Sequence, residues 1–182
     1  MGSTIAVARS VVPCCKACQL IVRKEDALAL SSHFIVTGLE AGHQVFAMAE
    51  PGRLKEFACR LSAKGFRPET LLHNRRLVFL TAPNCISTIF KSNEPLSRGL
   101  FLRNGSLLRW VSDWSWACDG SIELRSVLTF QRRIHDFVHS IAGLSLCTVD
   151  GEGMERSSLL ALMADHRRAV KLGGTQEQPS LT

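Results

Sequence analysis

Short apolar runs alternate with longer amphipathic stretches along the chain, a pattern that predicts strands alternating with helices. Two of the runs, 45–49 and 77–80, are apolar at every position, which suits strands buried on both faces of a parallel sheet. The pattern therefore predicts an α/β fold, a three-layer sandwich with a mostly parallel sheet between two layers of helices. The expected strands are 17–22, 43–49, 76–81, 106–112, 144–149 and 168–172.

Apolar residues at helical spacing predict the helices that connect these strands. Gly42, Gly65 and Gly143 each follow such a stretch, where a left-handed residue would end a helix. The segment 92–105 contains proline and glycine and is expected to be a loop. The expected helices are 25–40, 52–63, a short one at 84–91, 122–141 and 154–165.

The residues that end the strands are the first place to look for a binding site. In an open parallel sheet, the ligand crevice lies outside the carboxyl ends of the strands. Strand ends also open into solvated loops, so a polar residue there needs no function. The candidate ligand-binding residues at this edge are Glu50, Thr81, Asp113, Trp114, Trp116 and Asp150.

Asp113 stands out because it lies within 110–116, the segment that holds all three tryptophans of the chain. Three interpretations of this carboxyl group remain open. It could bind a hydrogen-bond donor, it could have a pKa raised by desolvation beside the aromatic rings, or it could cap the next turn.

The composition is that of a single globular domain: 182 residues, 46% hydrophobic and 21% charged. No stretch is long and apolar enough for a membrane span and the start of the chain lacks the pattern of a signal peptide, so a cytoplasmic location is expected. The net charge is +6, but the basic pairs are scattered and not interleaved with aromatic residues. Direct binding to nucleic acid is not expected.

Seven cysteines in a chain without a signal peptide argue for reduced thiols. Four of them lie singly among apolar neighbours and are expected to be buried packing residues: Cys59, Cys85, Cys118 and Cys147. Cys14, Cys15 and Cys18 form a cluster that could be redox-active. A zinc site completed by His135 and His139 is a less favoured alternative, and no metal or cofactor is expected.

The junction between the first strand and the first helix argues against nucleotide binding. Segment 20–28 contains no glycine, and Glu25 and Asp26 would repel a phosphate at the start of the helix. The Gly-Leu-Glu-Ala-Gly segment at 38–42 ends a helix instead of opening one. ATP hydrolysis is therefore not expected.

The ordered set of motifs resembles the MEDS domain, the methanogen/methylotroph DcmR-type sensory domain. The resemblance covers most of the chain, and the glycine-containing helix end followed by an apolar strand is its most specific part. It rests on the segments 18–22, 34–46, 51–54, 65–66, 76–82, 108–116, 144–150 and 166–170.

The resemblance implies a RecA/KaiC-like sheet without a phosphate-binding loop, because the family is similar to those ATPases. It also implies that small molecules, such as hydrocarbon derivatives, are sensed and the signal is passed to a regulator. Three features depart from the family. No helix-turn-helix, kinase or other output module is expected in this chain. The stretch between the third and fourth strands is shorter, and Gln131 occupies a position where relatives often have an acidic residue.

Together these observations predict a stand-alone sensory domain at 15–173, with an extension at 1–14 and a disordered tail at 174–182. It is not expected to be an enzyme. A small ligand would bind at the carboxyl edge of the sheet and shift the loop 92–105 between two states. A separate regulator, either a transcription factor or a histidine kinase, is the expected partner, and a homodimer is a further expectation. The alternatives are a divergent RecA/KaiC-like ATPase and a redox sensor acting through Cys14, Cys15 and Cys18.

Overall fold

The computed structural model describes residues 19–21, 24–82, 105–119, 123–149, 155–164 and 168–170. Within these ranges the chain forms a six-stranded sheet of order β3-β2-β4-β5-β1-β6, and every neighbouring pair is parallel. The strands are β1 (Gln19–Ile21), β2 (Gln44–Ala49), β3 (Leu77–Thr81), β4 (Leu108–Asp113), β5 (Leu144–Thr148) and β6 (Arg168–Val170). All six predicted strands are thus confirmed.

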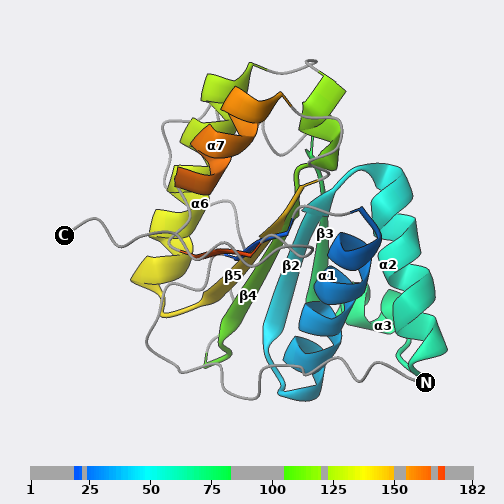
Figure 1. The fold of residues 1–182 in the computed structure, drawn as a ribbon. Helices are drawn as coiled ribbons and strands as arrows, with labels where there is room; N and C mark the ends of the chain where they lie inside the picture. The colour runs from blue at the N-terminus through cyan, green and yellow to red at the C-terminus, as the bar shows by residue number, and fades with distance from the viewer. Residues whose placement is uncertain are drawn as a thin grey trace, which may run out of the picture.

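Helices cover both faces of the sheet, as Figure 1 shows. The helices α1, α2 and α3 lie on one face, and α6 and α7 lie on the other with the short 3-10 helix η1. This arrangement confirms the three-layer α/β sandwich. The helices are α1 (Lys24–Glu40), α2 (Pro51–Ala63), α3 (Pro68–His73), η1 (Ser115–Asp119), α6 (Leu124–Ser140) and α7 (Arg156–Ala164).

Strand β2 illustrates why a central strand of this sheet carries apolar residues on both faces. Val45, Ala47 and Ala49 pack against α1 and α2, whereas Phe46 and Met48 pack into the cluster beneath α6. Successive side chains of a strand point to opposite faces, so a strand with helices on both sides needs apolar residues at every position.

Two elements were not predicted, and two predictions cannot be compared with the structure. The missed elements, α3 and η1, have only six and five residues, too few to show a helical period. The expected helix at 84–91 lies outside the described residues, and so does the loop expected at 92–105 except for Gly105.

Helix α1 ends at a left-handed glycine, as predicted. Gly42 has φ +76°, and the amide of His43 donates to the carbonyl oxygen of Gly38 at 2.9 Å. Gly65 adopts φ +83° after α2 in the same way. The prediction was wrong for α6, because Ala142 takes the positive φ there, at +53°. Gly143 serves packing instead, since a Cβ atom on it would lie 2.9 Å from a Val138 methyl carbon.

The chain connections that follow the neighbouring strands β2 and β4 lead in opposite directions along the sheet. After β2 the chain runs through α2 and α3 to the edge strand β3, whereas after β4 it runs through α6 to β5 on the other side. The helices that follow these two neighbouring strands therefore lie on opposite faces of the sheet. Such a switch point is where open parallel sheets bind their ligands.

Candidate functional site

The carboxyl edge of the sheet brings three of the candidate residues together. In the strand register Ala49 pairs with Thr81, Met48 pairs with Ser112, and Glu50 directly follows β2. Thr81, Glu50 and Asp113 therefore end three neighbouring strands, β3, β2 and β4, at the same edge. This edge includes the switch point between β2 and β4.

Glu50 and Thr81 differ in exposure. Glu50 is exposed and precedes Pro51, the first residue of α2, but its side chain makes no capping hydrogen bond to the helix. Thr81 is half-buried at the end of the edge strand β3. The Glu50 carboxylate is therefore accessible to a ligand or partner, and contact of either residue with a ligand stays a prediction.

Asp113 is buried, and both of its carboxylate oxygens are engaged within the protein. Arg53, in the first turn of α2, donates from Nε to Oδ2 at 2.8 Å. Ser115 donates to Oδ1 from its backbone amide at 3.0 Å and from its hydroxyl group at 2.6 Å. The interpretation that Asp113 caps the next turn is confirmed, because Ser115 begins η1.

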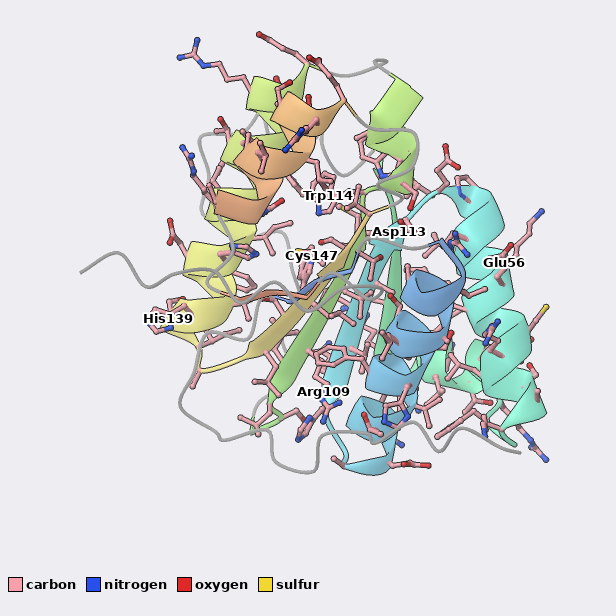
Figure 2. The ribbon with its side chains drawn as sticks, in the orientation of Figure 1. Glu56, Arg109, Asp113, Trp114, His139 and Cys147 are labelled. Atoms are coloured by element: carbon pink, nitrogen blue, oxygen red, sulfur yellow. The ribbon has the colours of Figure 1, made fainter. Side chains whose placement is uncertain are left out.

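Arg53 was not predicted as a site residue. It also donates from Nη1 to Glu56 at 2.6 Å, and the Glu56 side chain is 54% exposed, whereas that of Arg53 is only 12% exposed. The sequence signal was the arginine placed four residues after the end of β2, but sixty positions separate it from Asp113. The side chains of Glu56, Arg53 and Asp113 thus connect the surface of α2 to the buried end of β4, and Figure 2 labels the two outer residues, Glu56 and Asp113.

The tryptophans after β4 are buried. Trp114 is fully buried and Trp116 is 8% exposed, with ring centroids 5.9 Å apart. Trp114 also packs edge-on against Phe130 of α6 at 5.7 Å. The indole N–H of Trp116 donates to the backbone oxygen of Asp113 at 2.9 Å. These rings lie in the core behind Asp113, where they would report a change at the edge.

The remaining sequence candidates Asp150, Cys14, Cys15 and Cys18 lie outside the described residues. Cys147 is buried, as expected, with its Sγ atom 3.7 Å from Nε2 of His135. The prediction for Cys59 was wrong, because it is exposed on α2, whose apolar face is formed by Leu54, Phe57 and Leu61. Within the described ranges, no three potential metal ligands of the His, Cys, Asp or Glu type come together.

A second polar cluster, at the opposite end of β4, was missed by the sequence analysis. Arg109 donates from Nε to Nδ1 of His43 at 3.1 Å and from Nη1 to the backbone oxygen of Phe34 at 2.9 Å and the hydroxyl group of Thr37 at 2.7 Å. Its guanidinium also lies 4.8 Å from the centroid of the Phe34 ring. Burial lowers the pKa of Arg109. Figure 2 shows Arg109 and Asp113 at opposite ends of the strand.

Gly38 makes room for this arginine. A Cβ atom at position 38 would lie 2.6 Å from Cδ of Arg109. The first glycine of the Gly-Leu-Glu-Ala-Gly segment therefore has a packing role, separate from the helix-ending role of Gly42.

The same cluster is expected to make the free energy of unfolding depend on pH. Burial, followed by the charge of Arg109, lowers the pKa of His43 below its ordinary 6.5. Well above pH 6.5, the ordinary pKa, His43 is neutral in the unfolded chain and, with its lowered pKa, in the folded chain as well. As the pH falls below that value the unfolded chain binds a proton first, so the free energy of unfolding should decrease.

Thermal unfolding measured between pH 7.5 and 5 tests this prediction. We expect the His43→Gln variant to show a weaker loss of stability in acid, because glutamine can accept from Arg109 without titrating. The His33→Gln variant, which changes an exposed histidine of α1, is the matched control. Equal pH dependence in wild type and His43→Gln would contradict the prediction.

Comparisons with known proteins match residues 17–167 to one family model, described as the MEthanogen/methylotroph, DcmR Sensory domain (MEDS). The match lies inside the segment 15–173 that was expected to form the domain and covers well over half of the chain. No curated protein matches this chain. Among the described helices, none is both long enough and apolar enough to cross a bilayer.

Proposed function

The chain belongs to the MEDS family, the methanogen/methylotroph DcmR sensory domains, and from this premise we propose that it binds a small hydrocarbon-derived ligand at the carboxyl edge of the sheet. Membership of a sensory family gives the chain a sensory or regulatory role. The proposal adds the place of binding, the class of ligand and the route by which binding is communicated.

The observation that carries the proposal is the ion pair between Arg53 and Asp113. It spans the switch point, where a ligand crevice is expected, and links α2 on one face of the sheet to the turn at Ser115 that begins η1 on the other. The exposed Glu50 and Glu56 flank it, at the end of β2 and in α2. A ligand that contacts this edge can therefore act on both helical layers.

The proposed mechanism is a redistribution of contacts at Asp113. A ligand that competes for Arg53, or that packs against it, changes the support of the Asp113 carboxylate, which in turn caps the turn at Ser115. Because Trp116 donates to the backbone of Asp113 and Trp114 packs on Phe130, this change is passed to α6. The ligand must bind one of the two arrangements more tightly, since equal affinity would shift nothing.

We further propose that the domain does not hydrolyse ATP. Strand β1 ends at Ile21 and α1 begins at Lys24, so only positions 22 and 23 join them. A phosphate-binding loop of the Gly-x-x-x-x-Gly-Lys-Ser/Thr type needs about eight residues. The short junction supports a sensory domain that keeps the parallel sheet and lacks the nucleotide site.

Tryptophan fluorescence tests the proposal, because the described structure buries Trp110, Trp114 and Trp116. Dichloromethane, methanol and magnesium-ATP would each be added to the purified chain while the emission maximum and the melting temperature are followed. We expect one of the carbon compounds to change both signals, and the Glu50→Gln variant to weaken the response. Glu69→Gln, an exposed change on α3, is the control.

The possible outcomes separate the alternatives. If no carbon compound changes either signal, the small-ligand form of the proposal fails, and a protein regulator such as a transcription factor or histidine kinase becomes the better account of the edge. ATP hydrolysis that is lost in Glu50→Gln would overturn the non-enzymatic proposal.

A further inference from the structure

Arg109 has N–H groups left over after its contacts with the described residues. A guanidinium has five N–H groups, one on Nε and two on each Nη atom. The Nε group donates to His43, and the two groups on Nη1 donate to Phe34 and Thr37. The two N–H groups on Nη2 donate to no atom of the described residues.

The charge of Arg109 is also uncompensated within the described part of the chain. None of the described acidic side chains forms an ion pair with Arg109. A partly buried cation without a counter-ion is unfavourable, because it has lost hydration and gained no opposite charge. The position is nevertheless built for this side chain, since Gly38 lacks the Cβ atom that would displace it.

The guanidinium is held in one orientation. It donates three hydrogen bonds, two to α1 and one to the turn before β2, and its Cζ atom lies over the Phe34 ring. An arginine fixed in this way loses little further conformational freedom when it binds a ligand. Planar N–H groups on a fixed cation suit the oxygen atoms of carboxylate and phosphate groups.

We propose that Nη2 of Arg109 binds an oxyanion, a carboxylate or phosphate group, at the amino edge of the sheet. This site is separate from the proposed ligand site, because Arg109 lies at the beginning of β4 and Asp113 at its end. The inference therefore does not depend on the proposed function. The oxyanion supplies the counter-charge and the acceptors that Arg109 does not find among the described residues.

His43 gives a direct reporter of this site in the unmodified protein. Its ring accepts from Arg109, and the arginine charge contributes to lowering the pKa of His43. An oxyanion on Nη2 would offset that charge and make protonation of His43 easier. A purely structural arginine, which only ties α1 to β4, would show no such response.

The experiment is an NMR pH titration of the histidine side chains in sodium phosphate, in sodium acetate and in sodium chloride at equal ionic strength. We expect phosphate, acetate or both to move the His43 midpoint upward by roughly 0.5 pH unit relative to chloride. His33 and His139, both exposed, are the internal controls. A response to only one anion identifies which oxyanion binds, and equal His43 midpoints in all three salts would overturn the proposal.

Variants then assign the response to Arg109. Arg109→Lys retains a positive charge but lacks the second planar nitrogen, so the difference between the salts should disappear. Arg53→Gln, which changes the opposite edge, should retain it. A response that persists in Arg109→Lys would contradict the assignment, and if this variant does not fold, the wild-type titration decides on its own.

Discussion

Replacing Trp114 with alanine is expected to lower the free energy of unfolding by about 4 kcal/mol. The side chain is fully buried between Trp116 and Phe130, so the substitution removes a large apolar surface and leaves a cavity between β4 and α6. Stabilities of small domains are about 5–15 kcal/mol, so this loss would be a large part of the total. Urea denaturation followed by circular dichroism measures it.

The Trp114→Phe variant distinguishes a loss of core packing in Trp114→Ala from a failure of that variant to fold. Phenylalanine keeps an aromatic ring against Phe130, so we expect a smaller loss of stability and an unchanged slope of unfolding free energy against urea. Loss of less than 1 kcal/mol in Trp114→Ala would mean that this ring does not fill the core as described.

Replacing Asp113 with alanine is expected to cost about 3 kcal/mol, because removing one partner of a buried ion pair leaves the other charge uncompensated. The side chains of Asp113 and Arg53 are only 5% and 12% exposed. The variant also loses the two hydrogen bonds that Ser115 donates to the carboxylate. Urea denaturation at pH 7 gives the change in unfolding free energy.

A double-mutant cycle identifies how much of this cost belongs to the ion pair. With Arg53→Met already in place, Asp113→Ala should cost clearly less, because no unpaired cation remains. Glu56→Ala should cost less than about 1 kcal/mol, since that partner of Arg53 is half exposed. Equal costs of Asp113→Ala in both backgrounds would show that Arg53 and Asp113 do not stabilise each other.

The Trp114→Ala and Asp113→Ala substitutions each remove one part of the proposed connection between α2 and α6. Asp113 connects α2 to the turn at Ser115, and Trp114 connects that turn to α6. A domain that senses at the edge of its sheet needs a connection of this kind, because the ligand and the responding helix lie on different elements.

The strands were predictable because helices cover both faces of this sheet. Residues 45–49 of strand β2 pack against α1 and beneath α6, so all five are apolar, and that continuous run is visible in the sequence. The end of α1 was predictable because Gly42 adopts a φ that other residues rarely take. Ala142 shows the limit of that rule, since it adopts the same region without being glycine.

The site was only partly predictable. The end of β4 marked Asp113 as a candidate, but its partner Arg53 is sixty positions away and becomes a neighbour only through the strand order β2-β4. Arg109 and His43 are sixty-six positions apart and meet for the same reason. The tryptophans marked the correct segment, although whether their side chains would face the core or the edge could not be read from their spacing.

Hydrogen exchange measured with and without ligand tests the central claim most directly, because it shows where binding acts. Dichloromethane and methanol are the probes, and exchange is followed for each peptide of the chain. Binding at the carboxyl edge predicts altered protection in the first turn of α2 and in residues 113–116, extending into α6. Changes confined to the amino edge, around Gly42 and Arg109, or no change with either probe, would contradict the account.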